Sequence, residues 1–449
     1  MTEIITDPIV IDASIDSSKS DINITNSTSD NVQEVEIQIV DDIIEIPDSE
    51  EEMEVEITTK PVLDFALRPG LINNGNECFI NSTMQCLAVS PFINSFIKKY
   101  EKNDSNIIKL INKYELNKLR FNEMASAIKK LLDTHNIPPV EKVLLEHIAA
   151  KCADIYIYIC FKQIMQNLYS RKEATSTCTN FMNITRDVSQ GSGFDHLFNG
   201  SQNDPHEFLV YLLDRLHSAK ASKVTMEIPS SYEPDKIHLR LYLEHFKKRY
   251  ENDFSMFVKI FYYYMLTCIE CHNCKHVTYD VSPNDVMCVN LPDEWQHKPL
   301  ITLDDCIADY FKVEGIDYRC EKCQNTIGNR QDRKILTRPR TVIIKLKRYT
   351  QMNGGLHKIL KFIQYPKILN LDKYQCSSDS KPYELYGVIN HVGFMNGGHY
   401  YSFIRDYNPD TEKFSRGWMV CNDTQVSNIS EEEALHSKNA YILFYHNIE

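Results

Sequence analysis

One cysteine of this chain, Cys78, stands between a turn and the start of a predicted helix. The segment GLINNGNECFINSTMQCL, residues 70–87, begins with asparagines and glycines that break regular structure. From Phe79 onward apolar residues recur at helical spacing, and Pro91 is expected to end the helix. Backbone N–H groups and the dipole at a helix start favour a thiolate, so Cys78 is a candidate nucleophile. A small buried apolar residue is the ordinary alternative for such a cysteine.

A cysteine nucleophile needs a base, and the candidate is His399. It follows the glycines of NGG and precedes two tyrosines at the start of an apparent strand, where a flexible loop lets a substrate backbone pass close to the ring. Nineteen residues after this histidine, WMVCND places Asn422 and Asp423 at the predicted end of another strand. An amide or carboxylate that accepts the Nδ1–H of the imidazole would fix its tautomer. His391 lies in the same stretch, and spacing alone leaves it open as the base.

Four further cysteines are spaced as metal ligands. They form the C-x2-C pairs CHNC and CEKC, made by Cys271, Cys274, Cys320 and Cys323. Each pair can sit on a reverse turn with both sulfurs facing one ion, and four thiolates satisfy tetrahedral zinc. The 45 intervening residues imply two strand-rich arms joined by the ion. One structural zinc ion and no organic cofactor are expected, and the nearby Cys268, His272 and His276 are expected to be exposed or packed residues.

The composition narrows the class of protein. The 449 residues are 43% hydrophobic and 10% aromatic, enough for a large core. Residues 1–60 hold 17 acidic residues and two lysines, whereas the rest holds 47 basic and 45 acidic residues. The body therefore has no basic field, and nucleic-acid binding is not predicted. No signal peptide and no run of roughly 18 apolar residues is found, and fourteen cysteines are too few for a disulfide scaffold. We expect an intracellular protein, cytoplasmic or nuclear, not secreted and with no membrane partner.

The acidic tail, residues 1–60, is predicted to be disordered, because it lacks aromatic residues and helical period. Three β-branched runs in it, PIVIDAS, VEIQIVDD and DIIEIPDSEEE, could each add as an edge strand to a partner's sheet. These runs resemble SUMO-interacting motifs, so SUMO or sumoylated proteins are a candidate partner. The alternative is that such runs arise freely in an acidic, isoleucine-rich segment.

The elements that must position the candidate residues change in type along the chain. Residues 61 to about 220 are predicted to be mainly helical, since 105–132 and 144–170 have apolar residues three and four apart. Residues 177–200 are less regular. From about residue 235 onward, β-branched and aromatic runs of period two dominate: FSMFVKIFYYYMLTCI, TVIIKLKRY, YELYGVINHVG, GHYYSFIRDY and NAYILFYHNI. The candidate base therefore belongs to a strand-rich part and the candidate nucleophile to a helical one.

Taken together, the motifs resemble those of the ubiquitin-specific proteases. Residues 70–87 look like the cysteine box of that family, and residues 386–406 with WMVCND look like its histidine box. QNDPHEFLVYLL, residues 202–213, is similar to the Gln- and Asp-containing motif between the boxes. The C-x2-C pairs fall where the family carries zinc, and AYILFYH is like the strand that closes its catalytic domain. The resemblance covers roughly residues 65–449.

The resemblance implies an α+β, papain-like cysteine protease fold shaped as a hand. A helical thumb would span about 65–230, zinc-bearing β fingers about 235–335, and a β-sheet palm about 336–449, after the tail of residues 1–60. It also implies a thiol-dependent deubiquitinase whose partners are ubiquitin and ubiquitinated proteins. Such an enzyme hydrolyses isopeptide, peptide, ester or thioester bonds at the C-terminal glycine of ubiquitin through an acyl-enzyme.

The roles of the site residues follow from the same resemblance. Cys78 takes the position of the nucleophile, His399 that of the general base and Asn422 the third catalytic position, with Asp423 as a supporting acid. Asn73 takes the place of the oxyanion-hole asparagine, where a preorganised amide would meet the negative oxygen of a tetrahedral intermediate. The plain alternative for this asparagine is a turn residue.

Three more residues match positions that hold the ubiquitin tail: Gln202, Asp204 and Tyr400. Asp204 followed by Pro205 is also typical of a helix start, with the aspartate as cap. Residues 350–358 and 393–398 correspond to two loops that cover the tail. A tail that ends in two glycines fits a channel too narrow for a side chain.

The chain departs from the family pattern at a few positions. Glu77, where threonine is common, would oppose a thiolate at the neighbouring cysteine if its carboxylate faced the cleft. Phe79 replaces a tyrosine, and Asn203 and Pro205 replace the commoner Gln and Ala. Two alternatives to a deubiquitinase stay open: a catalytically weak or silent ubiquitin-binding scaffold, and a protease of another ubiquitin-like modifier.

Overall fold

The computed structural model describes residues 67–171, 175–226, 237–291, 297–352, 355–376, 381–394, 397–408 and 411–448, together with 39–41, 228 and 295. The disorder predicted for residues 1–60 lies outside these residues, apart from β1 (Ile39–Asp41). This strand falls within the run VEIQIVDD and pairs antiparallel with β4 (Val224–Met226) of the same chain. Part of that run therefore forms a strand, as predicted, but it pairs within the same chain. Its pairing with a partner protein stays a prediction.

The first part of the described chain is helical and forms the thumb. Its helices are α1 (Cys78–Ala88), α2 (Pro91–Lys99), α3 (Glu101–Lys113), α4 (Phe121–Thr134), α5 (Pro139–Ser170), α6 (Thr179–Ser189) and α7 (Pro205–Lys220). α1 begins at Cys78 as predicted. Pro91 opens α2, where Ser90 caps the helix by accepting a hydrogen bond from the Ile93 N–H. The proline therefore starts the second helix as well as following the end of the first.

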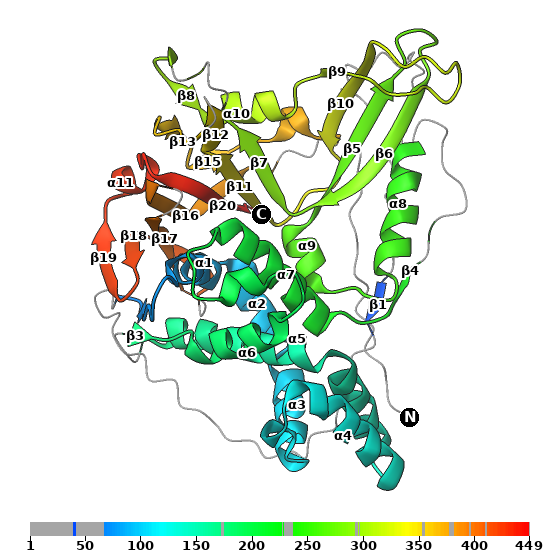
Figure 1. Ribbon diagram of the computed structural model, residues 1–449, viewed down its shortest axis with the longest axis vertical. Helices are drawn as coiled ribbons and strands as arrows, with labels where there is room; N and C mark the ends of the chain where they lie inside the picture. Colours follow the sequence, from blue (N-terminus) through cyan, green and yellow to red (C-terminus); the bar gives the residue numbers. More distant parts are fainter. Residues whose placement is uncertain are drawn as a thin grey trace.

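The helices α3 and α4 form a lobe with the first part of α5. The predicted helical run 105–132 is broken at Glu115, which has a left-handed backbone (φ 54°) and leads into a short 3-10 helix, Leu116–Lys118. The lobe has its own apolar core, which includes Ile107, Met124 and Leu145. Within α5 the backbone leaves helical geometry at Lys151 (φ −133°, ψ 24°). In Figure 1, α3 and α4 lie at the opposite end of the long axis from the fingers.

The palm is an eight-stranded sheet with the order β19-β18-β17-β16-β20-β11-β7, in which β15 also pairs with β16. Its strands are β7 (Val286–Asn290), β11 (Thr341–Lys347), β15 (Ile368–Leu369), β16 (Tyr383–Phe394), β17 (Gly397–Asn408), β18 (Lys413–Asn422), β19 (Gln425–Ile429) and β20 (Ala440–Asn447). Neighbours are antiparallel except β11 and β7. The strands expected in the four C-terminal runs are all present.

Smaller elements surround the palm. The pairs are β2 (Gly70–Leu71) with β3 (Thr175–Ser176), β8 (Ile301–Thr302) with β14 (Ile363–Gln364), and β12 (Tyr349–Met352) with β13 (Gly355–Lys358). Two short helices, α10 (Leu303–Tyr310) and α11 (Glu431–Leu435), complete this part. The α10 helix packs against β7 and contributes Leu303 and Ile307 to the apolar core on that side of the sheet.

The fingers are a four-stranded sheet with the order β6-β5-β10-β9, made by β5 (Tyr263–Glu270), β6 (Val277–Asn284), β9 (Glu314–Ile316) and β10 (Asn329–Ile335). Two helices, α8 (Ile237–Tyr250) and α9 (Met256–Phe261), precede them. The strand expected over FSMFVKIFYYYMLTCI was wrong in its first half, because α9 occupies it. Continuous apolar runs do not distinguish a buried helix from a buried strand, and this helix buries Phe257, Val258, Ile260 and Phe261.

The helix that carries Cys78 lies at the centre of the core. Every residue of α1 is buried, and the helix packs against β17 and β16 of the palm and against α5 and α7 of the thumb. Phe79 meets Phe208 of α7 edge to face with ring centroids 5.8 Å apart. Burying such a side chain contributes about 1.5–3 kcal/mol, so the helix start is held firmly. In the described part of the chain, no helix combines the length and the apolar character required to cross a membrane.

Candidate active site

The turn before α1 fixes the position of Cys78. Asn73 Oδ1 accepts hydrogen bonds from the backbone N–H groups of Gly75 and Glu77, both at 3.0 Å. Gly75 and Asn76 have left-handed backbones, at φ 126° and 48°, as expected of turn residues of these types. Cys78 is therefore the first helical residue, at the positive end of the helix dipole.

His399, near the start of β17, meets both Cys78 and the end of β18. Its Nε2 lies 2.6 Å from Oδ1 of Asn422, the last residue of β18. The pKa of His399 is raised to about 9, first by its hydrogen bond to the Cys78 side chain and then by that to Asn422, against the effect of partial burial. The ring is therefore charged at neutral pH. The ring nitrogen that faces Asn422 is Nε2, so our expectation of Nδ1 was wrong.

Asp423 connects the parts of this site. Its Oδ2 accepts a hydrogen bond from Asn73 Nδ2 at 2.9 Å and lies 3.9 Å from His399 Nε2. Its Oδ1 accepts a hydrogen bond from Asn81 Nδ2 on α1, also at 2.9 Å. The residue has a left-handed backbone, φ 51°, which aspartate tolerates better than most residues. One carboxylate thus orients the amide of Asn73, ties α1 to the end of β18 and faces the imidazole.

The chain around Gly70 packs directly on the backbone of Asp423 and Thr424. The Leu71 N–H donates to the Asp423 carbonyl at 2.8 Å. A Cβ at Gly70 would lie 2.4 Å from the Thr424 carbonyl oxygen, which no side chain allows. A glycine is therefore required for the segment before the nucleophile to reach the strand that carries Asn422.

The Glu77 carboxylate turns back onto its own loop. Its Oε2 accepts hydrogen bonds from the Asn74 backbone N–H at 3.2 Å and from Asn74 Nδ2 at 3.3 Å, and the residue is 9% exposed. It lines a cavity of about 200 Å³ together with Arg186 of α6. The charged groups that raise the pKa of His399 are Cys78 and Asp423. The carboxylate of Glu77 thus has local partners in the loop.

Two of the three residues expected to hold a substrate tail, Gln202 and Asp204, bridge the thumb and the palm, whereas Tyr400 packs on His391 and Tyr441 within the palm. Gln202 makes two hydrogen bonds to the backbone of Gly398, donating to its carbonyl at 2.7 Å and accepting from its N–H at 2.9 Å. Asp204 caps α7 through the His206 N–H, as the sequence predicts. Its other oxygen accepts from Lys345 of β11 at 2.6 Å and from the Tyr441 hydroxyl at 2.8 Å.

His391, the competing histidine, lies beneath these residues. It is 3% exposed, and its ring stacks on Tyr400 with centroids 4.4 Å apart. Its Nδ1 lies 3.0 Å from the Tyr349 hydroxyl and 2.9 Å from Lys358 Nζ. Burial, with a contribution from Lys358, lowers the pKa of His391 to about 4. It is neutral at physiological pH and bonds to neither Asn422 nor Cys78 in the described part of the chain, so His399 is the stronger candidate for the base.

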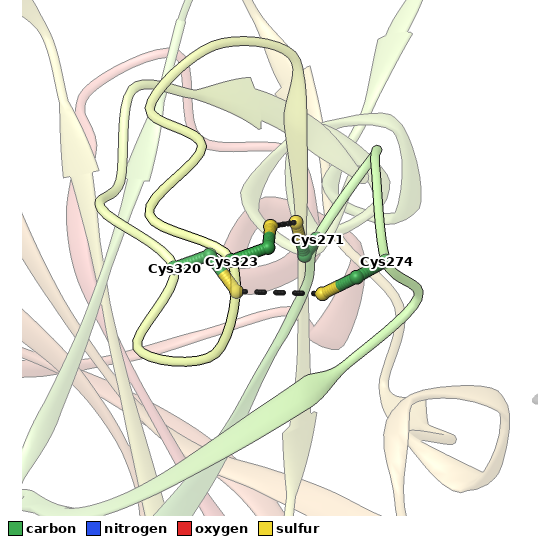
Figure 2. Close-up of side chains that lie close together, drawn as sticks. All are labelled: Cys271, Cys274, Cys320 and Cys323. Carbon is green, nitrogen blue, oxygen red and sulfur yellow. Dashed lines mark hydrogen bonds between the residues drawn. The ribbon is translucent and has the colours of Figure 1, made fainter.

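The four cysteines of the C-x2-C pairs meet at the tip of the fingers. Their sulfurs all lie within 4.8 Å of one another, with Cys271 and Cys323 3.5 Å apart and Cys274 and Cys320 3.6 Å apart. Figure 2 shows the four side chains converging from two separate loops. Four sulfurs about 2.3 Å from a tetrahedral zinc ion are about 3.8 Å apart. The cluster could therefore hold a metal ion.

The two loops that present these sulfurs share a turn hydrogen bond and a left-handed residue. In one, the Lys275 N–H donates to the Cys271 carbonyl and Lys275 is left-handed, φ 58°. In the other, the Gln324 N–H donates to the Cys320 carbonyl and Gln324 has φ 64°. Hydrogen bonds from backbone N–H groups, chiefly that of Cys274, lower the pKa of Cys271. In the same way, the backbone N–H of Asn325 lowers the pKa of Cys323. Among the described residues, Cys268, His272 and His276 lie outside the cluster.

Comparison with known proteins identifies the family. Residues 69–445 match the family described as ubiquitin carboxyl-terminal hydrolase. The chain belongs to the ubiquitin carboxyl-terminal hydrolase family. The family membership predicted from the cysteine and histidine boxes is therefore confirmed. The matched residues include nearly all of those that the structure describes.

Two relatives from Saccharomyces cerevisiae illustrate the relationship. Ubiquitin carboxyl-terminal hydrolase 4 is 23% identical over 429 residues, which cover 86% of this chain and 40% of the relative. Ubiquitin carboxyl-terminal hydrolase 8 is 25% identical over 394 residues, which cover 84% of this chain and 70% of the relative. The chain thus spans about two-fifths of the length of the first of these proteins.

The solved structure of the SAGA Ubp8/Sgf11/Sus1/Sgf73 DUB module bound to ubiquitin aldehyde has the same fold. It matches 87% of this chain and 72% of its own chain with a TM-score of 0.59 and 20% sequence identity. The expected α+β, papain-like fold of the ubiquitin carboxyl-terminal hydrolases is thereby confirmed.

Sequence reasoning missed three polar residues that organise the site of this family member. Asn81 lies three residues after Cys78 on a helix that is otherwise largely apolar, and this buried polar position was an available signal. Lys345 lies within the apolar run VIIKL and Lys358 at the end of a hairpin. Neither lysine gives a local signal, because the partner of each lies far away in the sequence.

Proposed function

We propose that this member of the ubiquitin carboxyl-terminal hydrolase family is a thiol-dependent deubiquitinase. The observation that carries the proposal is the contact of Cys78, at the start of α1, with His399, whose pKa is raised to about 9 and whose Nε2 lies 2.6 Å from Asn422. This arrangement suits a thiolate and an imidazolium at neutral pH. The proposed substrates are ubiquitin conjugates with isopeptide, peptide, ester or thioester bonds at the C-terminal glycine.

In the proposed reaction the Cys78 thiolate attacks the carbonyl carbon of the terminal glycine. The Cys78 backbone N–H and the second amide N–H of Asn73 stabilise the oxyanion, since the first amide N–H is bonded to Asp423. His399 gives its proton to the departing amine, and a thioester forms as the bond to the amine breaks. Water, deprotonated by His399, then attacks the thioester carbonyl, the carboxylate product leaves, and the Cys78 thiolate and the His399 imidazolium are regenerated.

The Gln202–Gly398 and Asp204–Lys345 contacts support a narrow tail channel. Both cross from the thumb to the palm, and Gly398, which has no side chain, directly precedes His399. A ubiquitin tail that ends in two glycines fits such a place, and its backbone would exchange hydrogen bonds with Gln202. We propose ubiquitin and ubiquitinated proteins as partners on this basis.

We further propose that the metal of the four-cysteine cluster is a single structural zinc ion. Cys271, Cys274, Cys320 and Cys323 would hold it, and four protein ligands leave no position for a substrate. The ion would join the loop after β5 to the loop before β10. Such a thiolate site requires a reducing environment, which supports the proposal of an intracellular protein.

The first test is hydrolysis of ubiquitin that carries a C-terminal fluorophore, with wild type, Cys78→Ala and Glu77→Thr side by side. We expect turnover by wild type and loss of turnover with retained ubiquitin binding in Cys78→Ala. The Glu77→Thr variant measures the electrostatic cost of that carboxylate as a gain in kcat. Ubiquitin binding without turnover by wild type would favour a silent scaffold. Neither turnover nor binding would favour another modifier, and the same assay with SUMO would then decide.

A further inference from the structure

Lys358, the last residue of β13, makes three hydrogen bonds beside the cleft. Its Nζ donates to His391 Nδ1 at 2.9 Å, to the His391 carbonyl at 2.9 Å and to the Gly393 carbonyl at 3.0 Å. An ammonium group has three protons and no acceptor, so all of its donors are used. The acceptors belong to the last residues of β16, whereas the lysine belongs to the β12–β13 hairpin. One side chain thus connects two hairpins.

These contacts determine the tautomer of His391. Since an ammonium group can only donate, Nδ1 of the ring must be the acceptor, and the neutral ring carries its proton on Nε2. The Tyr349 hydroxyl lies 3.0 Å from the same Nδ1. Lys358 and Tyr349 thus both approach the ring from the β12–β13 hairpin.

The opposite edge of that ring supports the strand that leads to the base. A Cβ at Gly398 would lie 2.2 Å from His391 Nε2, so the backbone of Gly398 rests directly on the protonated ring nitrogen. Gly398 precedes His399 and forms both hydrogen bonds with Gln202. The position of the His391 ring therefore sets the position of the backbone that lines the cleft.

We propose that Lys358 is a positioning residue for substrate binding, which joins the β12–β13 hairpin to the end of β16 and holds His391 under Gly398. The inference rests on the proposed function. It assigns to Lys358 and His391 the position of the Gly398 backbone, which would line the channel for a diglycine peptide tail. Lys358 acts through His391 and Gly398, and the bond of His399 to Asn422 does not involve it. Its loss should therefore raise KM and leave kcat nearly unchanged.

The charge of Lys358 has a consequence for pH dependence. Burial lowers the pKa of Lys358 to about 8, with a contribution from the neighbouring Arg348. The groups that face it are Arg348, the neutral His391 ring, the Tyr349 hydroxyl and two backbone carbonyls. As pH rises through about 8 the amine loses one donor, and one of the three contacts is lost. The KM of wild type should therefore rise above this pH.

The test is steady-state hydrolysis of ubiquitin with a C-terminal fluorophore between pH 6.5 and 9.5. For Lys358→Met we expect KM to increase about tenfold, kcat to stay within twofold, and the rise of KM near pH 8 to disappear. Lys358→Arg keeps its charge throughout and should retain a lower KM without the inflection. Lys373→Met, which removes an exposed lysine paired with Asp304, is the control for net charge. An unchanged KM in Lys358→Met, or a loss in kcat instead, would overturn the proposal.

A second readout does not depend on activity. The ring nitrogen shifts of His391, identified by comparison with His391→Gln, report its tautomer in protein with labelled histidine. We expect an unprotonated Nδ1 in wild type and a changed Nδ1 shift in Lys358→Met. If wild type shows no turnover, the proposed function fails, and this measurement still decides the role of Lys358. Unchanged ring shifts in Lys358→Met would refute that role. Thermal unfolding of both variants identifies a loss of folding, and Lys358→Arg then carries the test.

Discussion

The Asp423→Asn substitution keeps the shape of one side chain and removes its charge. Asparagine also tolerates the left-handed backbone of this residue, φ 51°. In the site, the two carboxylate oxygens accept one hydrogen bond each from Asn73 and Asn81, both at 2.9 Å. An asparagine offers one acceptor oxygen and one NH2 group, so one of the two neighbouring amides must lose its partner. The substitution therefore disturbs the site without leaving a cavity.

The magnitude follows from these contacts. A hydrogen bond to a charged group contributes about 1.5–3 kcal/mol, and loss of an entire oxyanion donor costs about 3 kcal/mol. We expect a loss of about 2 kcal/mol, or roughly thirtyfold in kcat. Asp423 Oδ2 also lies 3.9 Å from His399 Nε2, and the two side chains are 19% and 36% exposed. With solvent screening the interaction amounts to about 1 kcal/mol, so the pKa of His399 should be lower in the variant than in wild type.

The assay is the rate of hydrolysis of fluorophore-tagged ubiquitin from pH 6 to 10. Removal of a negative charge destabilises the imidazolium of the free enzyme, so the alkaline limb of kcat/KM should move to lower pH in Asp423→Asn. Asn81→Ala is the matched control, because it removes one partner of the same carboxylate and keeps both the charge and Asn73. It should lower thermal stability and leave the alkaline limb in place. A kcat within twofold of wild type together with an unmoved alkaline limb in Asp423→Asn would refute this account.

Three further outcomes are expected. The kcat/KM of wild type should fall as pH rises through about 9, because the raised pKa of His399 in the free enzyme marks the loss of the imidazolium that protonates the leaving amine; a kcat/KM that stays constant to pH 10 would contradict this. A zinc chelator, or Cys320→Ser, should lower the melting temperature, with recovery of the chelated protein on addition of Zn²⁺ but not of Mg²⁺; a melting curve that the chelator does not shift would count against the metal. Asp104→Ala should reduce the free energy of unfolding in urea by about 3–5 kcal/mol, because Asp104 is 2% exposed and pairs with the buried ammonium groups of Lys162 and Lys220. Its control is Lys113→Ala, which removes an exposed ion pair with Glu141 and should cost less than about 1 kcal/mol.

The main features of the candidate site could be predicted because their signals are local. The cysteine at a helix start, the histidine after a glycine loop and the paired C-x2-C turns each combine a reactive residue with the backbone chemistry that positions it. The strands that carry His399 and Asn422 alternate in polarity or form apolar runs, and they appear where the sequence predicts them. In these cases the local sequence and the final structure favour the same conformation.

The remaining features depend on contacts between distant residues. The helix α9 occupies a run rich in residues that favour strands, and only its burial against the rest of the core selects a helix. The partners of Asp423 are 350 and 342 residues away in the sequence, and a carboxylate beside an asparagine gives no sign of which amides it will meet. The choice between His391 and His399 likewise depends on burial, because the two histidines lie in the same stretch and differ in what covers them.

The bend of α5 at Lys151 also lies near the boundary between two apolar cores. Before the bend, α5 contributes Leu144, Leu145 and Ile148 to the core of the lobe. In the turn after it Ile155 still belongs to that core, and then Tyr158 and Phe161 belong to the core of the thumb. Between these two groups the backbone leaves helical geometry at Lys151. Amides of α4 can therefore exchange with solvent through an opening of the lobe alone, with a free energy below that of global unfolding. The thumb and palm that hold the cysteine and histidine can stay closed while this distant part of the chain opens and closes.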